Sequence, residues 1–493
     1  MYLYLVALLS SLQLILSADV AVFQLTSTAS FNIPPDFASF SVEVGTTFDI
    51  LTFNNAPRNS YINLMKHLKS MNTNLRGPNL RIGGNSADQS EFVPASTPLR
   101  VNDTYRISVA DLSAYSAAVK QWNGTIVMGV NMRSHIPDLA LLHVQAIAEN
   151  IGFDSDFIDS IEVGNENDVF FENYIRSPNY TANDYIDEFD NFTKYLTPIT
   201  GPNRIQGLTW CKMNATWNVK IPQILQTYVT DKPVFHSLSY HAYSLSACNG
   251  NKNNRLWMIL EDKAAIHKAE AYAPIISEVL AYNIPMRIGE GNSISCGGVA
   301  GISDTMASAL WAIDILYNMA LLGVSRWNFH GGTGGPYSPV RYANPDVIDA
   351  VEPMPIYYAQ WFFTFATAQS TTLYQLQNIS TTSTYIKGFS GRDENGIWRL
   401  TFLYKDMNAT ENDNVTIIAT SPLTKAASVY LLTAPSVSST SGLYFGGQTF
   451  DGTSNGIPAG TFGPDMTVMP TVPGTFTISL PPCSAAVVML PTV

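Results

Sequence analysis

Two stretches of sequence decide the fold expected for this chain: IEVGNEN at residues 161–167 and MRIGEGNS at residues 286–293. Each is an apolar, β-like run that ends abruptly in a glutamate, Glu166 in the first and Glu290 in the second, with glycine and asparagine beside it. Near-continuous apolar runs are typical of parallel strands that are buried on both faces. A parallel barrel carries its chemistry at the C-terminal ends of its strands. The two stretches therefore predict a barrel with two carboxylates at one end.

Six further β-like runs resemble these two, and helical patterns lie between most of the runs. The eight runs cover residues 39–44, 80–84, 125–131, 160–166, 206–210, 236–243, 286–290 and 325–330. The helical patterns include residues 61–71, 112–121, 140–150, 256–272 and 304–322. Eight alternations of strand and helix predict the α/β class and a closed (β/α)8 TIM barrel. The barrel would cover residues 39–370, which exceeds the roughly 250 residues usual for this fold and predicts long loops.

The composition changes after the barrel. Helical patterning stops, serine, threonine and glycine become more frequent, and alternating runs follow at residues 397–404, 415–419, 428–432 and 475–480. The sequence DENG at residues 393–396 is typical of a hairpin turn. Residues 371–493 are therefore predicted to form an antiparallel β-sandwich domain. Residues 19–38 precede the barrel, and their alternating start at residues 21–26 can add a strand to that domain.

The N-terminus, residues 1–18, has the pattern of a signal peptide. Its apolar stretch at residues 3–16 is too short to span a bilayer, and Ser17 and Ala18 follow as a cleavage site. No later segment resembles a membrane span. We therefore expect a secreted, extracellular protein with no membrane contact after cleavage. Eight sequons agree, and we expect N-glycans at Asn102, Asn123, Asn179, Asn191, Asn214, Asn378, Asn408 and Asn414.

Composition and charge exclude several classes of protein. The chain has 493 residues, of which 46% are hydrophobic and only 13% are charged, which favours a large packed core over disorder. The net charge is −12, with 39 acidic and 27 basic residues and no cluster of Lys and Arg. Nucleic-acid binding requires such a cluster to displace counterions. A nucleic-acid partner is therefore not expected.

Four cysteines, at positions 211, 248, 296 and 483, allow two disulfides in three connectivities. No Cys-x-x-Cys spacing occurs, so a structural zinc site is not expected. Cys248 and Cys296 follow neighbouring predicted strands, and we favour that pair, with Cys211 and Cys483 free.

The two glutamates are the main candidates for catalysis. Alone, a glutamate at a strand end is more often a solvated turn residue. Together, at the ends of the predicted fourth and seventh strands, Glu166 and Glu290 match the paired carboxylates of a retaining barrel glycosidase. Glu166 would be the general acid/base and Glu290 the nucleophile, with the carboxyl groups about 5–5.5 Å apart.

Two neighbours of Glu166 are also polar. Asn165 is either a strand-end cap or a donor to the sugar 2-hydroxyl. Glu162 is expected to face the barrel interior as a structural residue, and a buried carboxylate requires a partner, either Arg81 or Arg287.

Four motifs together resemble glycoside hydrolase family 79: LRIGGNSAD at 80–88, VGNE at 163–166, YHAY at 240–243 and GEGNS at 289–293. That family includes heparanase and microbial β-glucuronidases, and the chain resembles the secreted fungal β-glucuronidases. The resemblance covers nearly the whole mature chain. It implies a carbohydrate substrate and a reaction without metal or organic cofactor.

The resemblance also implies roles for individual residues. Glu166 matches the acid/base of the family and Glu290 its nucleophile. The remaining matches are side chains that bind sugar hydroxyls or lie near the nucleophile: Glu43, Asp88, His241, Tyr243 and Tyr337. The alternative for each is a purely structural role, as a packed aromatic or a polar loop group.

One position departs from the family pattern. Members related to heparanase bind the uronate carboxylate with Tyr-Gly-Gly after the nucleophile, whereas this chain has Ser295-Cys296-Gly297. Backbone N–H groups of Cys296 and Gly297 can still hold a carboxylate, but the tyrosine hydroxyl is missing. The motif therefore leaves open whether the sugar is a uronate or neutral.

These observations favour an exo-acting β-glucuronidase that releases terminal glucuronic acid, 4-O-methylated or not, from glycans. An endo-acting heparanase-like enzyme is disfavoured by the acidic composition. A barrel glycosidase for a neutral sugar and a non-catalytic carbohydrate-binding protein are also compatible with these residues. The glycine-rich residues 330–335 lack the Gly-Lys-Ser/Thr ending of a phosphate loop, and neither Gly-x-Ser-x-Gly nor His-Glu-x-x-His occurs.

Overall fold

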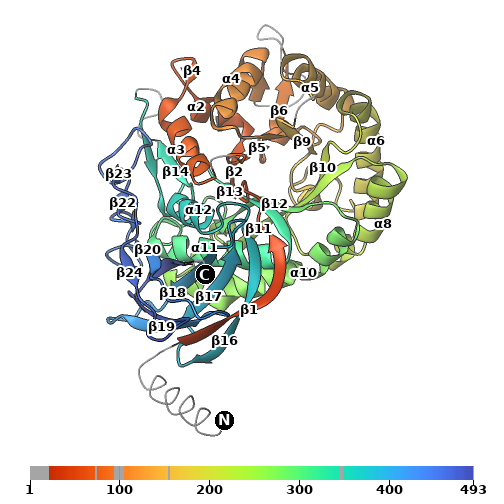
Figure 1. Ribbon diagram of the computed structural model, residues 1–493. Helices are drawn as coiled ribbons and strands as arrows, with labels where there is room; N and C mark the ends of the chain where they lie inside the picture. The colour runs from red at the N-terminus through yellow and green to blue at the C-terminus, as the bar shows by residue number, and fades with distance from the viewer. Residues whose placement is uncertain are drawn as a thin grey trace.

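The computed structural model describes residues 21–72, 75–93, 99, 105–153, 156–332, 334–342 and 348–491. Two regions are visible in Figure 1: a barrel surrounded by helices, and a region rich in strands that contains the C-terminal residues. The predicted signal peptide at 1–18 and the sequon at Asn102 lie outside the described residues.

The barrel is closed by eight parallel strands. Their order around the barrel is β2, β5, β8, β9, β10, β11, β12 and β13, and β13 pairs with β2. Each predicted run corresponds to one of these strands, which confirms the fold class. Nearly all strand residues are buried, as expected for strands covered on both faces. The strand bounds are β2 Ala38–Glu43, β5 Leu80–Gly83, β8 Ile126–Val130, β9 Ile158–Val163, β10 Ile205–Trp210, β11 Phe235–Ser246, β12 Met286–Ser295 and β13 Val324–His330.

Helices surround the barrel. The predicted pattern at 256–272 is interrupted in the structure, because Glu261 is extended and separates two helices. A helix over 182–200 was not among the predicted patterns; Thr181 and Asp184 form a capping box at its start. The main helices are α3 Asn59–Ser70, α4 Val109–Val119, α5 Pro137–Asn150, α6 Ala182–Thr200, α9 Leu256–Leu260, α10 Ile266–Ala281, α11 Met306–Leu321 and α12 Pro355–Ala366.

The second region is an antiparallel β-domain that includes an N-terminal strand. Strand β1 pairs antiparallel with β16 and parallel with β19. The long sheet folds back on itself, because Phe402 and Val488 on its central strands share one hydrophobic core with Ile417 and Phe476 near its edge. This arrangement confirms the predicted sandwich. Its strands are β1 Ala21–Asn32, β16 Thr372–Thr381, β17 Ile386–Arg392, β18 Trp398–Tyr404, β19 Asp413–Ile418, β20 Ala427–Thr433, β24 Met466–Val468, β25 Thr475–Leu480 and β26 Ser484–Leu490, with short strands β21 Tyr444–Phe445, β22 Gln448–Thr449 and β23 Ala459–Gly460.

Helix α11 joins the two regions. It is buried along nearly its whole length, because it packs between the barrel and the β-domain. Asp314 on this helix forms an ion pair with Lys405 just after β18, and the Tyr317 hydroxyl lies 2.8 Å from the Thr401 hydroxyl. Both side chains of the ion pair are at most 1% exposed, so each charge depends on the other.

A disulfide connects Cys248 and Cys296, with an S–S distance of 2.00 Å, which confirms the favoured pair. Cys211 and Cys483 are free. Among the described residues, no helix has the length and apolar character needed to cross a membrane.

Candidate active site

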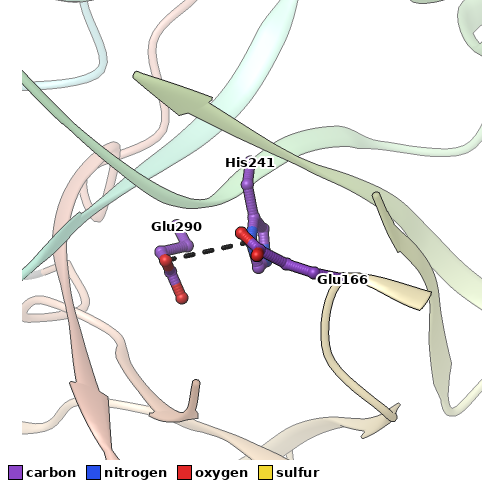
Figure 2. Close-up of side chains that lie close together, drawn as sticks. All are labelled: Glu166, His241 and Glu290. Carbon is purple, nitrogen blue, oxygen red and sulfur yellow. Dashed lines mark hydrogen bonds and ion pairs between the residues drawn. The ribbon is translucent and has the colours of Figure 1, made fainter. Parts of the chain in front are cut away.

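Three side chains converge at the C-terminal ends of three barrel strands (Figure 2). Glu166 follows β9, His241 lies on β11 and Glu290 lies on β12. Nδ1 of His241 is 2.9 Å from Oε1 of Glu166 and 3.9 Å from Oε1 of Glu290. One oxygen of each carboxylate and one nitrogen of the imidazole all lie within 4.8 Å of one another. The two glutamates singled out by the sequence therefore face each other across one histidine.

Hydrogen bonds and charges surround Glu290. The Tyr243 hydroxyl donates to Oε1 at 2.8 Å, Arg81 Nη1 donates to Oε2 at 2.7 Å, and His330 Nδ1 lies 3.6 Å from Oε2. Burial alone would raise the pKa of this carboxyl, but His330, His241 and Arg81 outweigh burial and hold the pKa well below its usual range. Glu290 is therefore an ionised carboxylate, as a nucleophile must be.

Arg81 on β5 connects several polar groups of the site. It is fully buried and donates to Glu162, to Oδ1 of Asn165 at 2.9 Å and to Oγ of Ser41 at 3.1 Å, in addition to Glu290. Burial would lower the pKa of Arg81, but Glu162 and Glu290 raise it, so the guanidinium stays charged. Of the two arginines considered for Glu162, Arg81 is the partner; Arg287 pairs with Asp159 instead.

Glu166 has an unusual backbone conformation. Its φ is +51°, in the left-handed region that is uncommon outside glycine. Its backbone N–H donates to the Thr209 carbonyl at 3.0 Å, and Thr209 itself has φ +58°. Such strain persists only where the surroundings enforce it, and it clusters at functional sites. The Glu166 side chain is 22% exposed, against 9% for Glu290, so Glu166 is the more accessible carboxylate to solvent.

Asn165 and Asp88 hold the segment before Glu166. The Asn165 amide donates to Oδ1 of Asn85 at 3.1 Å, and its backbone N–H donates to Asp88 at 2.9 Å. Asp88 also accepts the backbone N–H groups of Met132 and Arg133, at 2.8 and 3.1 Å. Burial raises the pKa of Asp88 to about 6, although these backbone donors lower it. Asp88 is 3% exposed and binds backbone groups; its predicted contact with a sugar hydroxyl stays a prediction.

Glu43 and His330 form a second pair beside Glu290. His330 Nε2 lies 3.5 Å from Oε1 of Glu43, and its Nδ1 lies 2.9 Å from Oγ of Ser41. Burial would lower the pKa of His330, but Glu290 and Glu43 raise it. Burial would raise the pKa of Glu43, but His330 lowers it. His330 was not predicted as a site residue from the sequence. Its position at the end of the eighth strand, before a glycine-rich loop, was the available signal.

Tyr337 and the loop after β12 complete the site. The Tyr337 ring lies 6.2 Å from that of Tyr243 and 6.0 Å from that of His330, between centroids. Cys296 and Gly297 have φ of +63° and +92°, and the disulfide anchors this loop to the segment after β11. The loop lies against Tyr337, because a Cβ on Gly298 would come within 2.8 Å of the Tyr337 backbone nitrogen. The structure thus connects most of the predicted residues through hydrogen bonds, ion pairs and ring contacts, and Asp88 joins them through the backbone N–H of Asn165. Cys296 and Gly297 lie in the adjacent loop.

The cluster of Glu166, His241 and Glu290 also has a spacing that suits a metal ion. Arg81 and Tyr243 already donate to the two oxygens of Glu290, and His241 contacts Glu166. The guanidinium of Arg81 beside the cluster would repel a cation. The polar atoms therefore satisfy one another, as expected for an acid–base site.

Comparisons with known proteins give a family model for the C-terminal domain and a fold for the chain. The family model described as "Glycosyl hydrolase family 79 C-terminal beta domain" matches residues 366–487. No curated protein sequence matches the chain. Among solved structures, a 4-O-α-L-rhamnosyl-β-D-glucuronidase from Fusarium oxysporum 12S superposes with a TM-score of 0.78 at 18% identity, over 95% of this chain and 100% of that chain.

Solved structures of arabinofuranosidases superpose with lower TM-scores. A family 51 arabinofuranosidase from Xanthomonas axonopodis pv. citri has a TM-score of 0.66 at 13% identity, over 96% of this chain and 99% of that one. An α-L-arabinofuranosidase from Thermotoga maritima has 0.65 at 13% identity, over 95% and 99%. The family match confirms the resemblance to family 79 for the C-terminal domain. The solved structures confirm the fold of the whole chain.

Proposed function

We propose that this glycoside hydrolase, whose C-terminal domain is of the family 79 type, is a retaining, exo-acting β-glucuronidase. Its substrate would be a glycan with terminal glucuronic acid, 4-O-methylated or not. Glu166 would be the general acid/base and Glu290 the nucleophile.

One observation carries the proposal: a carboxylate oxygen of Glu166 and one of Glu290 lie within 4.8 Å of each other. Retaining glycosidases place the two carboxyl groups about 5–5.5 Å apart, whereas inverting enzymes leave about 6.5–9.5 Å for a water molecule. The short separation supports direct attack by one carboxylate on the sugar.

The surroundings of the two glutamates support different roles. Glu290 is kept ionised by Arg81 and the two histidines, so it can attack the anomeric carbon and form a glycosyl-enzyme ester. Glu166 is the more exposed, and its proton would pass to the glycosidic oxygen as that bond breaks. In the second half, Glu166 would take a proton from water, whose oxygen displaces Glu290 from the sugar.

His241 supports this sequence of steps by contacting Glu166 directly. Arg81 Nη2, which can only donate, lies 3.5 Å from Nε2 of His241. Burial would lower the pKa of His241, but Glu290 and Glu166 raise it. In the charged ring, and in the neutral ring expected beside Arg81, Nδ1 carries a proton and donates to Glu166 at 2.9 Å. This hydrogen bond holds the carboxyl in place for both of its proton transfers.

Two observations bear on the choice of sugar. The solved structure with a TM-score of 0.78 is that of a β-D-glucuronidase, which favours a uronate. A neutral sugar is the second candidate, because no tyrosine precedes the glycine in Ser295-Cys296-Gly297. We also propose that the protein is secreted, and the Cys248–Cys296 disulfide supports an oxidising compartment.

The test compares four p-nitrophenyl glycosides, the β-glucuronide, β-glucoside, β-xyloside and β-galactoside, with wild type and Glu290→Gln. We expect hydrolysis of the glucuronide only, and its loss in the variant. Activity on a neutral glycoside alone would overturn the uronate assignment while keeping the two-glutamate mechanism. Inactivity on all four would contradict exo-hydrolysis.

A further inference from the structure

A cavity of about 520 Å³ lies in the β-domain, away from the two glutamates. Strands β1, β16, β17 and β18 contribute to its wall, together with the hairpin at 395–396, the segment after β19 and Pro491. None of its lining residues belongs to a barrel strand or to the catalytic group. A ligand in this cavity would therefore not contact the catalytic residues.

Two aromatic rings form the apolar part of this cavity. The rings of Tyr374 and Trp398 lie 4.9 Å apart between centroids in an edge-to-face arrangement. Tyr374 is half-buried, so part of its surface is open, and no described residue forms a hydrogen bond with its hydroxyl. Trp398 is only 9% exposed and supports the Tyr374 ring. Tyr374 combines a flat apolar face with a polar edge, which suits the C–H faces and hydroxyls of a sugar.

Arg392 supplies the only charge among the lining residues. Its guanidinium lies 5.6 Å from the centroid of the Trp398 ring, and its Nε donates to the Gly396 carbonyl at 3.1 Å. These two contacts orient the exposed Arg392 side chain and leave its terminal nitrogens available. No acidic side chain in the described part of the chain pairs with Arg392. The adjacent Asp393 is directed to Arg399 at 3.0 Å.

An unpaired and pre-oriented guanidinium is a receptor for a planar anion. Two parallel N–H groups match the two oxygens of a carboxylate. Within the described residues, the side chains of Asn395, Thr420 and Ser421 form no hydrogen bonds of their own, so they are available to neutral hydroxyls. A carboxylate, an apolar ring face and several hydroxyls occur together in a uronic acid.

We propose that this cavity binds a uronic acid residue of an acidic saccharide, with the carboxylate on Arg392 and the sugar ring against Tyr374, which packs on Trp398. The site anchors a glycan to the β-domain and does not require hydrolysis. It extends the function beyond the barrel and stands whether or not the barrel releases glucuronate.

The test measures retardation in native gels that contain an arabinogalactan with glucuronate side chains. Full-length Glu290→Gln protein is used, so that the polysaccharide stays intact during the run. We expect Arg392→Gln in this background to weaken the apparent Kd about tenfold, because a charge-assisted bidentate contact is lost. Thr420→Tyr, which fills the cavity from an exposed position, should weaken binding similarly without touching Arg392.

Three controls make the result decisive. The same polysaccharide with its carboxyl groups reduced should retard the parent protein less than the untreated polysaccharide does. Arg76→Gln, which removes an exposed arginine on the barrel, should leave retardation unchanged. Arg392→Gln with Glu290 intact should keep the kcat/KM for the p-nitrophenyl glycoside that wild type hydrolyses. Equal retardation of Arg392→Gln and its parent, or no difference after carboxyl reduction, would overturn the proposal.

Discussion

Arg81 and Glu290 form a buried ion pair, with 2.7 Å between Nη1 and Oε2, between strands β5 and β12. The same guanidinium also pairs with Glu162, so one cation compensates two buried carboxylates. Burying a charge is costly unless it is paired and hydrogen-bonded. The ionised state of Glu290, and with it the nucleophile, therefore depends on a residue 209 positions away in the sequence.

We expect Arg81→Gln to lose both activity and stability. The change leaves Glu162 and Glu290 without their cation, and breaking a buried ion pair in this way costs about 3–5 kcal/mol. Urea unfolding and kcat on the active glycoside measure the two effects. Arg341→Gln is the matched control, because its pair with Glu352 is exposed and contributes about 0–1 kcal/mol. Equal stability of the two variants would contradict the structure.

Glu166→Gln should slow the reaction by about 10²–10⁴-fold, the usual contribution of a positioned acid or base. Azide needs no general base, so it should restore turnover of a substrate with an activated leaving group. NMR of the first-formed sugar should show the β-anomer in the wild type, because two displacements retain configuration. An α-anomer would refute the nucleophile role of Glu290.

His330→Gln should shift the acid limb of kcat/KM to higher pH. His330 lowers the pKa of Glu290, so without it the nucleophile becomes protonated at a higher pH. A pH profile of kcat/KM in wild type and variant measures the shift, with the exposed His135→Gln as control. An unchanged acid limb would show that His330 does not act on Glu290.

The stabilising effect of His330 should decrease as the pH rises, whereas that of Glu290 should decrease as the pH falls. Its pKa is raised above the usual 6.5, so its contribution is complete below pH 6.5 and is lost as the pH rises through the folded pKa. Glu290 has a lowered pKa, so its contribution is present above pH 4.5 and lost as the pH falls through the folded value. The difference in unfolding free energy between wild type and His330→Gln should therefore decrease above pH 6.5. A difference that grows with pH would contradict this sign.

Cys248→Ser together with Cys296→Ser should lower the unfolding free energy by about 2–4 kcal/mol, the typical contribution of a disulfide. Without the disulfide, the loop after β12 loses its anchor. This should also raise KM, because the loop lies against Tyr337 beside the nucleophile. Denaturant unfolding and steady-state kinetics test both effects. Cys211→Ser, which removes a free cysteine, should leave the unfolding free energy within about 1 kcal/mol of wild type. An unchanged KM in the double variant would show that the disulfide does not shape the site.

The sequence by itself determined the barrel, the sandwich and the two glutamates. These features depend on local patterns: runs of buried strand residues, alternation in the β-domain, and glutamates placed where strands end. Such patterns indicate which face of a helix or strand is buried, so they predict these elements before any tertiary contact is known. The break between α9 and α10 could not be predicted in this way, because the extended Glu261 ends α9 and a short 3-10 helix precedes α10 within an otherwise continuous helical pattern.

Only the tertiary structure decided which polar groups meet. Arg81, and not Arg287, pairs with Glu162 and Glu290. Asp88 accepts hydrogen bonds from backbone N–H groups, and His330 connects Glu43 to the site. Partners in a closed barrel come from strands far apart in the chain, and their distances depend on strand order and register. A carboxylate also has several suitable donors in any sequence. The folded geometry, through distance and burial, selects among them.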